Sequence, residues 1–213
     1  MGRRSFDEGH RLRAPGAALV GVDEAGRGPL AGPVVVVAVV LPESPGPDFR
    51  EVRDSKLMTE KARERAFSVI ASQARAVSVA WAHHRDIDEK NILAATLAAM
   101  GRAARRAASK TAGPVLVMVD GPRKATGLDL SQEAVVDGDA KSLTIAAASV
   151  VAKVVRDRWM ARMERRFPGY GFAVHKGYGT KRHLVALGDL GPCRIHRRSY
   201  APVRRAEALV GSR

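Results

Sequence analysis

Residues 17–42 read AALVGVDEAGRGPLAGPVVVVAVVLP, and this stretch is the first informative segment of the chain. Segments 18–22 and 34–41 are apolar and rich in β-branched residues, with Gly or Pro nearby, a pattern typical of β-strands. An unbroken valine run such as residues 34–37 is expected in a strand that is buried on both faces. We therefore predict two strands, joined by the glycine-rich segment 23–29.

The rest of the chain alternates between strand-like and helix-like segments, which predicts an α/β fold with a mixed sheet. Further strands are predicted at 76–81, 114–119 and 134–136, and helices at 59–72, 92–108, 142–166, 181–187 and 203–210. Residues 167–178 are expected to form a loop. We divide the chain into a basic N-terminal tail (1–16), an α/β domain (17–166) and a C-terminal subregion (167–213) that packs on this domain.

The chain is strongly basic, with a formal net charge of +14 over 213 residues. The excess lies in residues 150–213, which hold 15 basic and 4 acidic side chains, whereas the preceding 149 residues hold 21 and 18. A near-neutral body with a cationic C-terminal third favours a polyanionic partner, with nucleic acid first and an anionic membrane second. A solubilising surface is the alternative interpretation.

Several protein classes are excluded by composition. The single cysteine, Cys193, rules out a disulfide scaffold and a cysteine-based zinc cage. The longest apolar run, residues 34–41, is far shorter than the roughly 20 residues that a membrane-spanning helix needs. The polar and basic residues 1–16 do not resemble a secretory signal. We therefore expect a soluble, cytoplasmic protein.

Acidic side chains follow three of the predicted strands. Asp23 and Glu24 come directly after the first strand, Asp120 follows another, and Asp139 follows the short strand at 134–136. Strand ends in α/β sheets commonly line the functional cleft, where converging carboxylates repel one another unless protonated or bridged by cations. Oxygen ligands select Mg²⁺ or Mn²⁺, and two such ions suit phosphodiester cleavage. Alternatively, each acid is an ordinary cap or turn residue.

Three loops carry residues suited to a phosphate or sugar. Gly26, Arg27 and Gly28 combine close backbone approach with a planar guanidinium. The Asp54-Ser55-Lys56 segment offers a hydroxyl and an ammonium, or alternatively a helix cap, and Tyr178 in the loop 175–180 offers a ring that could stack on a sugar or base. Each feature also has a purely structural interpretation, as a turn or as a tyrosine that covers the core.

Taken together, these motifs resemble those of the bacterial ribonuclease HII family. The resemblance covers about residues 19–203 and consists of several ordered blocks, which together are far more specific than any one of them. The blocks are 23–29 (DEAGRGP) with 32–33, 54–56 (DSK), 119–121 (VDG), 138–142 (GDAKS) with 145–153 (IAAASVVAK) and 156–157, 167–171 (FPGYG), 175–180 (HKGYGT) and 197–203 (RRSYAPV).

The resemblance implies an RNase H-like fold, with a mixed sheet flanked by helices and a small C-terminal helical subregion. It implies a metal-dependent endonuclease that cleaves the RNA strand of RNA/DNA hybrids and nicks duplex DNA 5′ of a single ribonucleotide, leaving a 3′-hydroxyl and a 5′-phosphate. The acids carried over as catalytic and metal-binding are Asp23, Glu24, Asp120 and Asp139, with Mg²⁺ or Mn²⁺ and two ions per site during turnover. Asp137 competes with Asp139 but does not occupy the Gly-Asp position, and Asp157 is a subsidiary acid.

Substrate contacts implied by the resemblance are Gly26, Arg27, Gly28 and Tyr178 at the RNA–DNA junction, and Ser55 and Lys56 are added as phosphate contacts. The expected partners are RNA/DNA hybrids and ribonucleotide-containing duplex DNA, with no membrane, and the expected state is a monomer. Ribonuclease HIII fits less well, because that relative has an additional N-terminal domain and lacks this form of the loop. A non-catalytic basic module that coats nucleic acid and a binder of anionic membranes are the rivals from other classes.

Overall fold

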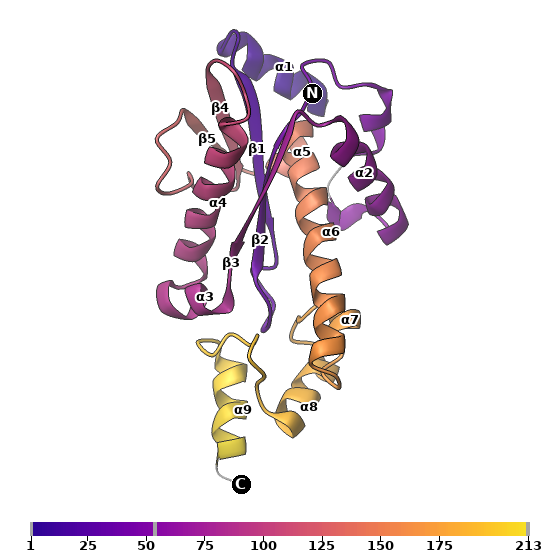
Figure 1. Ribbon diagram of the computed structural model, residues 1–213, viewed down its shortest axis with the longest axis vertical. Coiled ribbons are helices and arrows are strands. Elements are labelled where there is room, and N and C mark those ends of the chain that lie inside the picture. The colour runs from indigo at the N-terminus through magenta and orange to yellow at the C-terminus, as the bar shows by residue number, and fades with distance from the viewer. Residues whose placement is uncertain (1, 53–54, 212–213) are drawn as a thin grey trace.

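The computed structural model describes residues 2–52 and 55–211, and it has a five-stranded mixed sheet at its centre (Figure 1). The strand order is β3-β2-β1-β4-β5. The pairs β1–β2 and β2–β3 are antiparallel, and the pairs β1–β4 and β4–β5 are parallel. The strands are β1 (Ala18–Ala25), β2 (Val34–Val40), β3 (Ala76–Ala82), β4 (Val115–Asp120) and β5 (Gln132–Val135). The predicted α/β fold class with a mixed sheet is confirmed.

The hairpin β1–β2 forms where the valine-rich stretch predicts it, but β1 is longer than expected. Asp23 pairs with Val37 and Ala25 with Val35, so Asp23 and Glu24 lie inside β1 and not after it. The reason is that β2 offers ladder partners as far as Val35, which extends β1 past its apolar part. Every residue of β2 is buried, as expected for a strand covered on both faces.

Helices cover both faces of the sheet (Figure 1). Helix α4 (Ile92–Ala108) packs its alanine-rich side on one face, and helix α6 (Leu143–Arg166) packs on the other. Helix α6 approaches β1 closely because Gly21 lacks a side chain, and a Cβ there would clash with the Thr144 carbonyl. The close contact holds the middle of β1 against the start of α6.

Shorter helices complete the structure, and several of them were not expected. The remaining elements are α1 (Arg3–Arg13), η1 (Pro47–Glu51), η2 (Ser55–Leu57), α2 (Glu60–Gln73), α3 (His84–Lys90), α5 (Gly138–Lys141), α7 (Phe172–His175), α8 (Lys181–Leu190) and α9 (Ala201–Gly211). None of the helices described is both long and apolar enough to cross a membrane. Asp54 lies outside the described residues.

The segment expected as a basic tail differs most from the structure, because it folds into α1 and packs on the body. Asp7 and His10 of α1 are buried. The Asp7 carboxylate accepts hydrogen bonds from the Thr144 amide and hydroxyl at the start of α6, at 3.0 and 2.7 Å. This contact is made by a side chain far away in sequence, so a basic composition alone does not reveal it.

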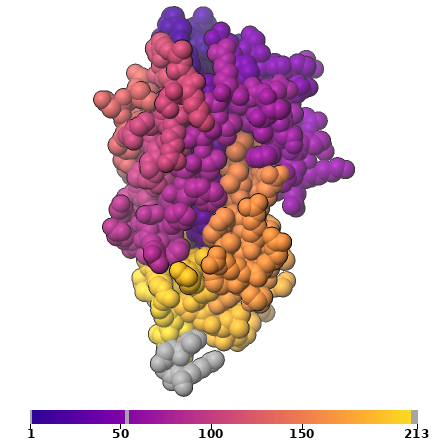
Figure 2. Space-filling model, viewed as in Figure 1, coloured from indigo at the N-terminus to yellow at the C-terminus, as the bar shows by residue number. Residues whose placement is uncertain are grey.

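The C-terminal elements α7–α9 lie below the sheet, beside the lower half of α6 (Figure 1), and form one end of the molecule (Figure 2). They attach to the loop that links β1 to β2. Ala31 forms a β-bridge with His196, and Leu30 packs with Leu187 and Val203. The loop after β1 is therefore enclosed between the sheet and the C-terminal segment.

Candidate active site

Carboxylates from two adjacent parallel strands meet at one edge of the sheet. Val22 is in register with Val119, which places Asp23 and Glu24 of β1 beside Asp120 at the end of β4. Helix α5 supplies Asp139 from the next segment, and it is held there because its Gly138 amide donates to the Asp120 carboxylate at 2.7 Å. The structure thus brings together the four acids predicted from sequence.

Asp23, Glu24 and Asp120 open onto a cleft of about 240 Å³. The cleft also includes most of the other side chains singled out in the sequence and three polar ones that were not. Its lining is Asp23, Glu24, Ala25, Gly26, Arg27, Gly28, Ser55, Lys56, Asp120, Ser149, Lys153, Arg156 and Tyr178. Asp139 does not line the cleft itself, but its carboxylate lies 3.3 Å from Nζ of Lys56, which does.

Burial and mutual repulsion raise the pKa values of three of the acids. Asp23 is only 4% exposed, and burial, then the Glu24 and Asp120 charges, raise its pKa well above the ordinary value. Burial also raises the pKa of Glu24, and burial followed by the Asp139 charge raises that of Asp120. Such a group of buried like charges is stabilised either by protons or by a cation.

The donor set is suited to a hard divalent cation. It consists of carboxylate oxygens, which favour Mg²⁺ or Mn²⁺. Among the described residues, no three Asp, Glu, His or Cys side chains lie close enough together to hold a metal ion without moving. Glu24 instead lies 3.5 Å from Arg27, and Asp139 pairs with Lys56. Mg²⁺ usually keeps several waters and binds through one or two carboxylates, so the residues present fit a hydrated ion.

The two acids left open in the sequence occupy different positions from the four. Asp137 is exposed and has a left-handed backbone, with φ of 54°, at the start of α5, whereas Asp139 is only 6% exposed. Asp157 on α6 pairs with Lys153 at 2.8 Å and does not line this cleft. The geometry therefore favours Asp139 over Asp137 as the fourth acid.

The Gly-Arg-Gly loop and Tyr178 lie at the same cleft. Gly26 has a φ of 100°, which disfavours any residue with a side chain, and a Cβ there would clash with the guanidinium of Arg156. Both observations require glycine at this position. A Cβ on Gly28 would lie 3.6 Å from the Tyr178 ring, which is 45% exposed. Residues 150 positions apart in the sequence therefore form one surface beside the acids.

Ser55 and Lys56 also reach the cleft, in different ways. The Ser55 hydroxyl is buried and lies 2.9 Å from the Ser149 hydroxyl, which itself hydrogen-bonds the Asp23 carboxylate. Lys56 is exposed and pairs with Asp139. Ser55 thus contacts Asp23 indirectly, through Ser149, whereas the Lys56 side chain is accessible to a phosphate.

Three polar cleft residues were not selected from the sequence, namely Ser149, Lys153 and Arg156. They are spaced four and three positions apart on α6, so they share one helix face. That spacing is the signal that could have identified them, but it is hidden in a helix that is buried on most sides.

Comparison with known proteins matches the ribonuclease HII family profile to residues 20–203. Ribonuclease HII of Burkholderia mallei (strain SAVP1) is 50% identical over 197 residues, covering 92% of this chain and 89% of the relative. Ribonuclease HII of Burkholderia thailandensis has the same identity and coverage.

Solved structures share the fold. Ribonuclease H2 from Pyrococcus horikoshii superposes with a TM-score of 0.74 at 26% identity, covering 92% of this chain and 99% of that one. The ribonuclease HII in a PCNA complex from Archaeoglobus fulgidus gives 0.70 at 26% identity, covering 86% and 95%. A Bst ribonuclease HIII in complex with Mn²⁺ gives 0.75 at 18% identity, covering 92% and 71%, and this likeness concerns the fold alone. The RNase H-like architecture is thereby confirmed.

Proposed function

The chain belongs to the ribonuclease HII family, and from this premise we propose that it nicks duplex DNA on the 5′ side of a single embedded ribonucleotide, leaving a 3′-hydroxyl and a 5′-phosphate. As a member of this family it is a ribonuclease H, an endonuclease that hydrolyses phosphodiester bonds in the RNA strand of RNA/DNA hybrids. Nicking at a single ribonucleotide within duplex DNA is the more specific activity that we propose.

One observation carries the proposal: the acids and the predicted sugar-recognition residues line the same cleft. Asp23, Glu24 and Asp120 line it together with Gly26–Gly28 and Tyr178. A nuclease that recognises one ribonucleotide must sense the 2′-hydroxyl close to the bond that it cleaves, because only this hydroxyl distinguishes the nucleotide from DNA. Placing both functions in one cleft meets that requirement.

For catalysis we assign the metal-binding role to Asp23, Glu24, Asp120 and Asp139, with Mg²⁺ or Mn²⁺ and two ions during turnover. When bound, divalent cations would polarise a phosphate oxygen and lower the pKa of a bound water, which makes that water a better nucleophile. The chain's own contribution is to gather the carboxylates and surround them with cations. Lys56 and Lys153 line the cleft, and they can neutralise phosphate charge next to the acids.

For recognition we assign the junction to Gly26, Arg27, Gly28 and Tyr178. The loop backbone would bond the 2′-hydroxyl, and the Tyr178 ring would pack on the following deoxyribose, where a second hydroxyl would collide. Lys56 would contact a phosphate, and Ser55 would hold Ser149 and the Asp23 carboxylate in place.

We further propose that residues 17–166 carry the acids and that residues 167–213 contribute substrate contacts, because the latter include Tyr178 and the basic excess. The proposed partners are RNA/DNA hybrids and ribonucleotide-containing duplexes, bound by a monomer in the cytoplasm. A non-catalytic basic module would not need a cluster of buried carboxylates with raised pKa values, so it is the less favoured function.

The test is to incubate the protein with a duplex that contains one ribonucleotide, in Mg²⁺, Mn²⁺ or EDTA, and to map the nick. We expect one nick 5′ of the ribonucleotide with either cation and none with EDTA, and an all-DNA duplex of the same sequence should stay intact. Binding without nicking under all conditions would instead support the non-catalytic module. Cleavage of RNA/DNA hybrids without cleavage at a single ribonucleotide would refute the finer proposal alone.

A further inference from the structure

Two arginines are fully buried next to the Gly-Arg-Gly loop. Arg156 is 1% exposed and Arg197 is 0% exposed, and within the described residues neither forms an ion pair with a carboxylate. A buried guanidinium without an anionic partner is costly unless its N–H groups are hydrogen-bonded. Such a cost suggests that these arginines serve a purpose beyond general stability.

The guanidinium of Arg197 binds both ends of the loop through main-chain carbonyls. Its Nη2 donates to the Gly26 carbonyl at 2.6 Å, its Nη1 donates to the Arg27 carbonyl at 2.7 Å, and its Nε donates to the Gly32 carbonyl at 3.0 Å. The Tyr200 hydroxyl donates to the Arg27 carbonyl as well, at 3.0 Å. The direction of two consecutive loop carbonyls is therefore fixed from one side.

Fixing these carbonyls also fixes the N–H groups on the other side of the same peptide units. The described peptide bonds are trans, and in a trans peptide the C=O and N–H bonds point in opposite directions. The amides of Arg27 and Gly28 thus point away from Arg197. In the described part of the chain neither of these amides donates a hydrogen bond to the backbone. Arg27 and Gly28 line the cleft, whereas Arg197 does not.

We propose that Arg197 is a positioning residue for specificity: by holding the Gly26 and Arg27 carbonyls, it aims the Arg27 and Gly28 amides at the 2′-hydroxyl oxygen of the ribonucleotide. The inference rests on the proposed function and deepens it. Two parallel N–H groups form a small concave donor pair of the kind that receives an oxygen acceptor. An arginine is needed because its planar fork serves three carbonyls at fixed angles, which a lysine ammonium cannot do.

Arg156 supports the same loop but is a poorer subject for a test. Its guanidinium donates to the carbonyls of Ala31, Pro33 and Lys176, at 3.2, 3.1 and 3.0 Å. However, Arg156 also lines the cleft, so its replacement would change the shape of the cleft wall as well as the loop. Arg197 can be changed without touching the substrate.

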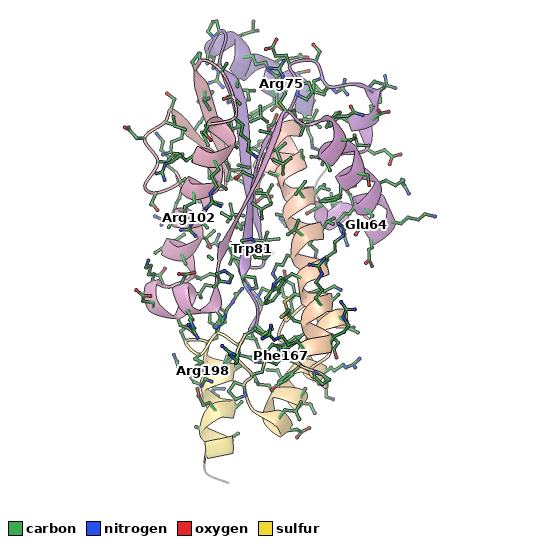
Figure 3. The ribbon with its side chains drawn as sticks, in the orientation of Figure 1. Glu64, Arg75, Trp81, Arg102, Phe167 and Arg198 are labelled. Carbon is green, nitrogen blue, oxygen red and sulfur yellow. The ribbon has the colours of Figure 1, made fainter. Side chains whose placement is uncertain are left out.

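The experiment compares binding to two duplexes of one sequence, with and without a single ribonucleotide, in EDTA so that neither is cleaved. The variants are Arg197→Lys, Tyr200→Phe and, as a matched control, Arg198→Lys. Arg198 is adjacent in sequence but lies on the outside near α9, where it pairs with Glu207 (Figure 3). Circular dichroism and Tm establish that each variant is folded.

We expect Arg197→Lys to reduce the preference for the ribonucleotide duplex about tenfold, the value of one well-placed hydrogen bond to a buried donor pair, with the all-DNA Kd unchanged. Tyr200→Phe should reduce the preference by a smaller factor, and Arg198→Lys should leave it unchanged. A purely structural role would weaken both Kd values together and keep their ratio, which would overturn the inference. If Arg197→Lys does not fold, the same comparison of the two Kd values in Tyr200→Phe tests the inference, and an unchanged ratio would overturn it.

The outcomes for the inference and for the proposed function are separable. If the wild-type protein nicks at a single ribonucleotide and prefers that duplex, while Arg197→Lys and Tyr200→Phe keep the full preference, the inference is wrong and the function stands. If the wild-type protein neither prefers nor nicks the ribonucleotide duplex, the proposed function itself is wrong.

Discussion

Nε2 of His183 lies 3.0 Å from Nε2 of His196, and both imidazoles are buried. The Cys193 amide donates to Nδ1 of His196 at 3.0 Å, so the His196 proton is on Nε2 and is donated to His183. The remaining proton of His183 is then on Nδ1, which donates to the Tyr178 carbonyl at 2.9 Å. This series of hydrogen bonds needs two neutral rings, and it holds the backbone of the predicted recognition tyrosine.

The histidine pair predicts a loss of stability in acid. Burial, then the neighbouring His183, lowers the pKa of His196 to about 3, and burial lowers that of His183. The unfolded chain takes up these protons near pH 6.5 and the folded chain does not. The free energy of unfolding should therefore fall as pH drops below about 6.5, by up to about 1.4 kcal/mol per pH unit for each histidine that stays neutral in the folded state. For His196 this fall should continue towards pH 3. Urea unfolding between pH 5 and 8 measures this slope.

A variant comparison isolates the histidine contribution to that slope. His196→Asn should have a flatter profile than the wild-type protein, because it removes one group that the folded state keeps neutral. Ile145→Val, in a separate apolar cluster, should lower stability by about 0.5–1.5 kcal/mol at every pH without changing the slope. Equal slopes in the wild-type protein and His196→Asn would contradict the account.

Asp23→Asn should stabilise the protein in the absence of divalent cations. Burial and the Glu24 and Asp120 charges raise the pKa of Asp23, so the folded state binds this proton above pH 3.8 and loses stability as pH rises through the folded pKa. Asparagine keeps an oxygen that can accept the Glu24 amide and carries no charge. We expect a higher Tm in EDTA at pH 8, by about 2–4 °C for each kcal/mol gained.

The same variant should respond less than the wild-type protein to added Mg²⁺, because one oxygen ligand has lost its charge. The exposed Asp129, changed to Asn, is the control and should leave both the Tm in EDTA and the Mg²⁺ response unaltered. A lower Tm in EDTA for Asp23→Asn would show that the acids do not repel one another as described.

Asp120→Asn and Asp139→Asn should each reduce turnover of an RNA/DNA hybrid by about 10²-fold or more, since each assigned metal ligand supports several kcal/mol of charge stabilisation. Hybrid binding in EDTA should change little, and neither variant should have a lower Tm in EDTA than the wild-type protein, because each removes an acidic charge from the cluster. Asp137→Asn is the matched control for Asp139, because it lies two residues away, is exposed, and has a left-handed backbone that asparagine tolerates. Steady-state kinetics would refute the assignment if Asp137→Asn were the inactive variant and Asp139→Asn turned over normally.

The sequence predicts the centre of this fold well because the relevant signals are local. The valine run defines β2, and the apolar segment before Asp23 defines most of β1, since burial on both faces leaves an unmistakable composition. The four acids could be selected because each lies close to the end of an apolar strand. That the pairing extends β1 over Asp23 and Glu24 depends on β2 and could not be inferred from β1 alone.

Two features could not be predicted, because they depend on contacts between distant segments. Arg156 and Arg197 contribute to the basic excess that indicates a polyanionic partner, yet both side chains are buried and bind carbonyls of the loop. The segment that forms α1 is polar and basic, and its place is set by Asp7 at the start of α6. A count of charges does not distinguish a surface arginine from one that organises backbone.

Asp7→Ala should lower the free energy of unfolding by about 1–3 kcal/mol, because the amide and hydroxyl of Thr144 would lose their buried acceptor. Asp7→Asn keeps an acceptor oxygen and removes a buried charge whose pKa is raised by desolvation, so its effect should be smaller. Urea unfolding at pH 7 compares the two variants. Equal stability of Asp7→Ala and the wild-type protein would mean that α1 does not depend on this contact.

Tyr178→Ala should separate recognition of a ribonucleotide from general affinity for duplex. The ring is nearly half exposed, so its removal should change stability by no more than about 0.5 kcal/mol. Its backbone stays fixed, because the amide donates to His175 and the carbonyl accepts from His183, at 2.9 Å each. We expect kcat/KM at a single ribonucleotide to fall about 10–100-fold, the value of one ring packed on the substrate, with less than a twofold change in Kd for an all-DNA duplex.

Tyr178→Phe is the matched control for this prediction, since it keeps the ring and removes only the hydroxyl. If the ring acts by packing on the deoxyribose, the phenylalanine variant should retain most of the wild-type kcat/KM. A parallel loss of activity and of all-DNA affinity in Tyr178→Ala would assign the ring to general binding. Unchanged kinetics in that variant would assign recognition to the Gly26–Gly28 loop, which lines the same cleft.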